Sequence, residues 1–192
     1  MIFVVAILLA VVLARLRGGR LERLGQLSFR FAPLIIVGFV IQILIFTPIL
    51  GSHLSRPQIA LAYDLSMILV WGTLAMNWRV PGAPLMALGV FSNWLVITLN
   101  GGFMPASQDA LLQAGFVSRA MMTGNQHYNN TILIDANTRL PFLADIMAVP
   151  AALPFSNVFS PGDLLLATGT AWLVQRVMVA AQPTTGATKS SP

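Results

Sequence analysis

Five apolar segments dominate this 192-residue sequence and decide what kind of fold it can adopt. A transmembrane helix needs about 20 predominantly apolar residues, and five stretches meet or approach that length. They span residues 1–16, 31–50, 58–76, 83–99 and 161–181. We therefore expect an all-α integral membrane bundle of five transmembrane helices. Four of them lie in residues 1–99, and the fifth follows a long loop over residues 100–160.

Composition excludes several classes of protein. Only 9% of the residues are charged and 56% are hydrophobic, whereas a soluble domain carries roughly a quarter charged residues. So few charges cannot cover a soluble surface, and a disordered chain would be less apolar. The absence of cysteine excludes disulfides, thiolate metal sites and cysteine nucleophiles. Nucleic acid is not an expected partner despite the net charge of +5, because most basic residues lie beside an apolar segment.

The first apolar segment differs from a secretory signal peptide in the order of its charges. A signal peptide has a basic region before its apolar core. Here the arginines follow the apolar core instead, at Arg15, Arg17, Arg20 and Arg23. This order indicates a retained helix whose N-terminus is outside.

The distribution of positive charge predicts the membrane orientation. With the N-terminus outside, eight of the 11 basic residues lie on the inner side and three on the outer side. The inner residues are Arg15, Arg17, Arg20, Arg23, Arg30, Arg79, Arg176 and Lys189, and the outer ones are Arg56, Arg119 and Arg139. The positive-inside rule then places the C-terminus in the cytoplasm, with residues 182–192 as a disordered cytoplasmic tail.

Two structural motifs flank the long loop, which we expect to be ordered and extracytoplasmic because its sequence is not of low complexity. At its start, Asn100, Gly101 and Gly102 end the fourth helix, since adjacent glycines tolerate positive φ and close backbone approach. At its end, Ser160 is the predicted N-cap of the fifth helix and Asp163 the capping-box residue that reaches back to it. An acidic side chain there also suits the positive end of the helix dipole.

Between these motifs the sequence predicts three further features. Ser107 can cap a helix from residue 108 to about residue 122 that either lies on the membrane surface or covers the outer end of the bundle. Residues 126–135 are predicted to form either a short strand or an irregular crossing. Residues 140–155 are apolar, but three prolines and Asp145 interrupt them. We therefore predict that they are interfacial or re-entrant and not a sixth span.

Polar side chains inside the predicted spans identify a candidate site, because such groups are costly in lipid and usually face the protein interior. Gln42, Asp64 and Asn93 lie at roughly 12, 9 and 10 Å from the outer ends of their helices. They therefore share one layer in the outer third of the membrane. Asp64 is the costliest of the three, since a carboxylate in low dielectric must be paired or protonated.

Two interpretations of this layer stay open. It is either a polar pocket that opens to the outer side, with a basic side chain of the loop (Arg119, Arg139 or His127) paired to Asp64, or a structural cluster that holds helices together. No metal is predicted, because His53 and His127 lack ligand spacing. No cofactor is predicted either, although a bound lipid or quinone would suit the pocket. The candidate pocket residues are Gln42, Asp64, Asn93, His127, Arg139 and Asp145.

The chain resembles an uncharacterised family of small bacterial multi-pass inner-membrane proteins. The resemblance implies a bacterial inner membrane and no particular reaction, and it draws attention to His127, Arg139, Asp145 and Asp163. The matching pieces are the segment from Asn100 to Pro105, then His127, the segment from Thr138 to Asp145, and the segment from Ser160 to Leu166.

These observations support two hypotheses of function. The first is an accessory or scaffold subunit, not itself an enzyme, that packs against other subunits of a larger, energy-transducing membrane complex. The alternative is a membrane enzyme or binding protein for a lipid, a quinone or another amphiphile at the outer interface. A transporter is least favoured, since the spans carry one acid and no pair of broken helices.

Overall fold

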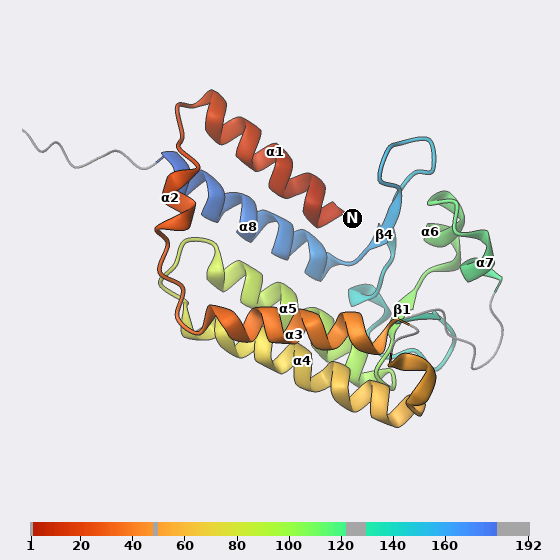
Figure 1. Ribbon diagram of the computed structural model, residues 1–192. Helices are drawn as coiled ribbons and strands as arrows, with labels where there is room; N and C mark the ends of the chain where they lie inside the picture. Colours follow the sequence, from red (N-terminus) through yellow and green to blue (C-terminus); the bar gives the residue numbers. More distant parts are fainter. Residues whose placement is uncertain (1, 48–49, 122–129, 180–192) are drawn as a thin grey trace, which may run out of the picture.

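The computed structural model describes residues 2–47, 50–121 and 130–179, and five long helices make up most of it (Figure 1). One helix falls on each of the five apolar segments, so the prediction of a helix in each segment is confirmed. They are α1 (Ile2–Leu16), α3 (Ala32–Ile45), α4 (Arg56–Met76), α5 (Ala83–Leu99) and α8 (Pro161–Val179).

The five helices pack as a chain of neighbours whose spatial order differs from their sequence order. α1 packs against α8, α8 against α5, α5 against α4, and α4 against α3. The short helix α2 (Glu22–Gly25) follows α1 and contacts α8 at the end of the bundle opposite the long loop (Figure 1). The main apolar core lies where α4 and α5 meet their neighbours, and a smaller core joins α1 to α8.

Glycines let α5 and α8 approach each other closely. A Cβ added at Gly89 of α5 would lie 2.5 Å from the backbone oxygen of Gly162 in α8. About two helical turns further along, a Cβ added at Gly169 would lie 2.7 Å from the backbone oxygen of Gly82. Small residues of this kind allow backbone-to-backbone packing between membrane helices. The resulting contact brings the start of α8 against the middle of α5.

Two asparagines fasten distant segments to the ends of α4 and α5. The Asn77 amide accepts a hydrogen bond from the backbone N–H of Arg30 and donates one to its carbonyl, both at 2.8 Å. The Asn100 amide makes the same pair of bonds with the backbone of Arg139, both at 2.9 Å. Each amide also donates, at 2.7 Å, to a carbonyl one turn earlier in its own helix. These side chains therefore end a helix and hold a remote segment at once.

The predicted all-α fold is wrong for the long loop, which contains two small sheets. β1 pairs in parallel with β2, and β3 pairs antiparallel with β4 as a hairpin. Short loop segments carry unpaired backbone groups, and strand pairing satisfies them without a helix. We call this region, residues 100–160, the cap. Its strands and short helices are β1 (Met104–Ala106), α6 (Gln108–Gln113), α7 (Val117–Ala120), β2 (Thr131–Leu133), the 3-10 turn Pro141–Leu143, β3 (Met147–Val149) and β4 (Asn157–Phe159).

The single surface helix predicted over residues 108–122 is two short helices. Ser107 is its N-cap as predicted, accepting from the backbone N–H of Ala110 at 3.4 Å. The break comes at Gly115, whose φ of +80° is left-handed and therefore incompatible with a continuing α-helix. Residues 126–129 of the predicted strand or crossing lie outside the described residues, while β2 shows a strand at the end of that segment. Residues 140–155 hold a 3-10 turn and part of the hairpin, with no helix of spanning length.

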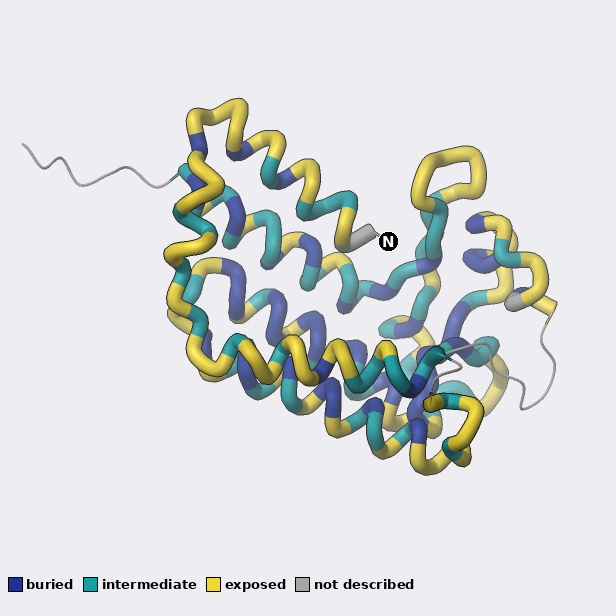
Figure 2. Tube along the Cα trace, viewed as in Figure 1, coloured by how far each residue is buried: buried dark blue, intermediate teal, exposed yellow. Residues whose placement is uncertain are grey.

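Among the residues that the structure describes, α4 alone is both long and apolar enough to cross a membrane by length and composition. Shorter apolar helices occupy Val4–Leu16, Ala32–Ile45 and Ala83–Leu99. At a rise of about 1.5 Å per residue, helices of this length reach roughly 20–26 Å, less than a hydrocarbon core of about 30 Å. Figure 2 shows α1 and α3 exposed along their outer faces, and large apolar side chains make up much of that exposed surface.

Candidate functional site

A cavity of about 260 Å³ lies where four helices meet. Each of α3, α4, α5 and α8 contributes side chains to its wall, so residues far apart in the sequence surround one space. The wall combines apolar side chains with four polar ones. The apolar residues are Phe39, Met67, Val70, Val90 and Leu166, and the polar ones are Gln42, Tyr63, Asn93 and Asp163.

A hydrogen-bond network at one wall of the cavity ties α5 to the start of α8. The Asn93 amide donates to Asp163 Oδ1 at 2.9 Å and accepts from the Ser160 hydroxyl at 2.8 Å. Asn93 and Ser160 are both buried. A Cβ added at Gly162 would collide with the Asn93 amide oxygen, so glycine is required there for this contact.

The predicted capping box at the start of α8 is confirmed and supplies half of this network. The backbone N–H of Ser160 donates to Asp163 Oδ2, and the backbone N–H of Asp163 donates to the Ser160 hydroxyl, both at 3.0 Å. One carboxylate oxygen of Asp163 therefore caps the helix while the other binds Asn93. The carboxylate sits at the positive end of the α8 dipole, which stabilises its charge.

The wall of the cavity also carries the side-chain amide of Gln42 in α3, which is bonded to α4. Gln42 Nε2 donates to the Ser66 hydroxyl at 3.1 Å, and that hydroxyl donates to the backbone oxygen of Tyr63 at 2.6 Å. Over the described part of the chain, no group donates to Gln42 Oε1. The Gln42 carbonyl is therefore an available acceptor on a side chain that lines the same cavity as Asp163.

Tyr63 connects the cavity to the cap. Its side chain is buried, packs edge-on against Phe46 with ring centroids 4.8 Å apart, and is hydrogen-bonded to the side chain of Asn130. Asn130 directly precedes β2, and its backbone oxygen accepts from the N–H of Met104 in β1 at 2.7 Å. One end of the cavity is thus joined to the first sheet of the cap.

The structure brings together some of the predicted pocket residues and separates others. Gln42 and Asn93 line the same cavity. Asp64 does not line it; the half-buried Asp64 carboxylate accepts a hydrogen bond from Thr98 Oγ1 at 2.6 Å, between α4 and α5. Consecutive helix residues point about 100° apart, so Tyr63 faces the cavity and its neighbour Asp64 faces elsewhere.

The predicted residues of the loop occupy different parts of the cap. Arg139 is exposed, and its backbone forms the pair of bonds with Asn100 described above. Asp145 is half-buried, and its backbone bonds to Pro105 and Ser107 join it to β1. His127 lies outside the described residues. In the described parts of the chain, no group of three or more His, Cys, Asp or Glu side chains could hold a metal ion.

Sequence reasoning missed Tyr63 and Ser66 as members of the site. A signal for them exists, because Tyr63, Ser66, Met67 and Val70 recur at the i, i+3, i+4, i+7 spacing of one helix face. That face is the one that α4 turns toward the cavity and its neighbours. Reading the polar residues by helix face as well as by depth would have included both.

The comparisons with known proteins identify relatives without assigning them an activity. Residues 26–175 match the model of a family of unknown function, DUF5317. An uncharacterised protein of Thermotoga maritima is 24% identical over 170 residues, which cover 88% of this chain and 84% of the relative. No solved structure matches the chain.

Proposed function

Because the chain belongs to the DUF5317 family of unknown function, we propose a function from its geometry: a multi-pass bacterial inner-membrane protein that binds the polar head group of an amphiphile, of the quinone or lipid class, in the four-helix cavity. The observation that carries this proposal is the mixed wall of the cavity. Polar groups from four helices converge on a space whose remaining wall is apolar.

The size of the cavity suits a head group better than a whole ligand. Sites for complete small molecules occupy roughly 300–1,000 Å³, and this cavity measures about 260 Å³. An amphiphile would place its head group between Gln42 and Asp163 and leave its hydrocarbon tail in the lipid. Both residues offer oxygen acceptors, so a head group that carries a hydroxyl donor fits best, as in a quinol or a lipid with a free hydroxyl group.

The exposed apolar surface supports membrane insertion of all five helices. Large apolar side chains are exposed on the outer faces of each helix, among them Leu8 of α1, Ile36 of α3, Leu61 of α4, Leu88 of α5 and Trp172 of α8. Proteins in water rarely expose apolar patches of more than a few hundred Å². Flanking residues and local thinning of the bilayer would let the shorter helices span.

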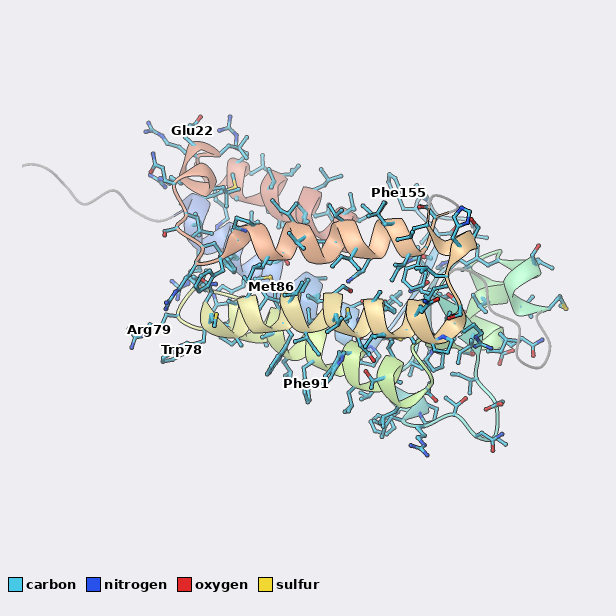
Figure 3. The ribbon with its side chains drawn as sticks, turned by 60° about the horizontal axis from the view of Figure 1, so that its bottom comes forward. Glu22, Trp78, Arg79, Met86, Phe91 and Phe155 are labelled. Carbon is cyan, nitrogen blue, oxygen red and sulfur yellow. The ribbon has the colours of Figure 1, made fainter. Side chains whose placement is uncertain are left out.

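The two ends of the bundle support the orientation with the N-terminus outside. α1 begins at the end that carries the cap, and Glu22, Trp78 and Arg79 lie at the end opposite Phe155 (Figures 1 and 3). The arginines that follow α1 share the end of Arg79. We therefore propose that the cap is extracytoplasmic and the α2 end cytoplasmic, which reporter fusions after residues 25 and 179 would test.

The binding proposal is tested by identifying what the cavity holds. The full chain is purified in mild detergent and its extracted lipids and quinones are measured by mass spectrometry. We expect one amphiphile at a ratio near one per chain, and a several-fold loss in Gln42→Met, which keeps the side-chain volume but removes the amide. Gln113→Met on the exposed cap surface is the control. Equal content in both variants would refute the proposal.

A second candidate function is that of an accessory subunit of a larger membrane complex. The exposed apolar side chains of the cap favour it. Seven large apolar side chains on the described part of the cap, outside the long helices, are between 41 and 62% exposed. A partner subunit would cover them. Stoichiometric co-purification of another membrane protein from the native membrane supports this candidate, and loss of the partner on charge substitution of these residues identifies the surface. They are Leu112, Val117, Met121, Phe142, Ile146, Leu153 and Phe155.

A further inference from the structure

A second space lies along the outer side of the α1–α8 contact, separate from the four-helix cavity. It is a groove of about 490 Å³ whose apolar lining ends in two polar side chains. Ala10, a member of the small core between α1 and α8, forms part of its floor. The lining residues are Ala6, Leu9, Ala10, Leu13 and Arg17 of the first helix and its end, with Ala167, Thr168, Ala171 and Gln175 of α8.

We propose that this groove binds one anionic phospholipid, with an acyl chain along the groove and the phosphate beside Arg17. The inference rests on the proposed membrane insertion and orientation, but it is independent of the head-group cavity. The two sites share no lining residue.

The dimensions of the groove favour a hydrocarbon chain over a helix. From Ala6 to Arg17 the groove extends about 16 Å at 1.5 Å per residue. A volume of about 490 Å³ over that length gives a mean cross-section of about 30 Å². A helix with side chains is about 10 Å across, and its cross-section is roughly 80 Å². The cross-section of the groove therefore matches a flexible hydrocarbon chain more closely than a helix.

Charge at the end of the groove indicates the head group. Arg17 Nη1 donates to the neutral Gln175 Oε1 at 2.8 Å, so this contact leaves its positive charge uncompensated. Arg15, Arg20 and Arg23 lie close to Arg17 in the sequence, between the last turn of α1 and α2. None of these four arginines forms an ion pair with an acidic side chain in the parts of the chain that the structure describes. A basic site between helices at the cytoplasmic side is the arrangement that binds anionic lipid head groups.

Gln175 lines the groove and is hydrogen-bonded to the positively charged Arg17. Its Nε2 donates to the backbone oxygen of Ala10 at 2.6 Å while its Oε1 accepts from Arg17. The Gln175 amide thereby holds the Arg17 guanidinium beside the groove and links α8 to α1. The remaining N–H groups of Arg17 can donate to phosphate oxygens.

The test compares two phospholipids on the full chain. Delipidated protein in mild detergent is titrated with phosphatidylglycerol or phosphatidylcholine, and bound lipid is counted by native mass spectrometry. We expect one phosphatidylglycerol per chain and a weaker affinity for phosphatidylcholine. Arg17→Gln should weaken phosphatidylglycerol binding roughly fivefold, the equivalent of one surface charge. Arg79→Gln, exposed at the same end but outside the groove, should leave it unchanged.

A groove-filling variant tests the acyl chain separately from the charge. Thr168 is exposed and lines the groove, so Thr168→Phe should fold and reduce the binding of both lipids, whereas Leu61→Phe on the outer face of α4 should not. Equal affinity for the two lipids, or no effect of either groove variant, would overturn the proposal. So would a dimer of the chain that Thr168→Phe dissociates. The amphiphile content measured with Gln42→Met is independent of these results, so failure of one site is distinguishable from failure of the other.

Discussion

Replacing Asn93 by alanine removes both side-chain hydrogen bonds that tie α5 to the start of α8. The lost bonds are the donor bond to the Asp163 carboxylate at 2.9 Å and the acceptor bond from the buried Ser160 hydroxyl at 2.8 Å. A hydrogen bond to a charged group contributes about 1.5–3 kcal/mol and a neutral one about 1 kcal/mol in water-soluble proteins. Bonds between membrane helices average about 0.6 kcal/mol. We therefore expect Asn93→Ala to lower the free energy of unfolding by about 2 kcal/mol.

A double-mutant cycle isolates the Asn93–Asp163 contact from the capping box. Asp163→Ala also loses the bond to the Ser160 N–H, which adds roughly 1 kcal/mol of capping energy to its effect. The coupling energy between Asn93→Ala and Asp163→Ala removes that contribution, and we expect it to be about 1–2 kcal/mol. Reversible unfolding of the full chain by SDS in mixed micelles, followed by circular dichroism, measures all four species.

The half-exposed pair Asp64–Thr98 provides the matched comparison. It also joins two long helices through one half-buried carboxylate, by a single bond of 2.6 Å, so its coupling should be about 0.6 kcal/mol, the average for bonds between membrane helices. A coupling below about 0.3 kcal/mol for Asn93–Asp163 would refute the assignment of this network as a helix–helix link.

Three further predictions address the packing of α5 against α8, the attachment of the cap, and Asp64, which does not line the cavity. Gly89→Ala places a Cβ 2.5 Å from a backbone oxygen of α8 and should lower the free energy of unfolding by at least about 2 kcal/mol through overpacking. The control Gly72→Ala, where a Cβ meets no atom within 4 Å, should be neutral or stabilising by up to about 1 kcal/mol. Equal shifts of the thermal midpoint in the two variants would contradict the close contact of α5 and α8. Asn100→Ala should lower the free energy of unfolding by about 1–2 kcal/mol and make the cap more susceptible to limited proteolysis. An unchanged cleavage rate would show that the bonds between Asn100 and the Arg139 backbone do not hold the cap. Asp64→Asn should leave the amount of bound amphiphile unchanged, and a loss comparable to that in Gln42→Met would place Asp64 in the site after all.

The helices were predictable from the sequence because each depends on local signals. Apolar runs locate the five segments, and Ser160 with Asp163 identifies the start of α8 through the spacing of a capping box. Gly115 illustrates where local signals mislead. Its neighbours continue an apolar helical pattern, but its backbone is left-handed and divides the helix into α6 and α7.

The site was only partly predictable, because depth along a helix and direction around it are separate quantities. Gln42, Asp64 and Asn93 were placed at one depth, and two of them line one cavity. Which face of α4 turns inward depends on packing against its neighbours, and this decides that Tyr63 and not Asp64 reaches the cavity. The partner of Asn93 lies 70 residues away in sequence, so only the close approach of α5 and α8 reveals it.

Asn77 and Asn100, which we call the two asparagine clamps, hold a remote segment by its main chain and not by its side chains, so they restrict the sequence of that segment very little. Asn77 and Asn100 bind the N–H and C=O of Arg30 and Arg139, groups that every residue except proline supplies. Positions 30 and 139 can therefore change their side chains without loosening the clamps, whereas the asparagines cannot change without losing them. Charge at these two positions is thus independent of the bonds that the asparagines make, and it is open to selection for membrane orientation.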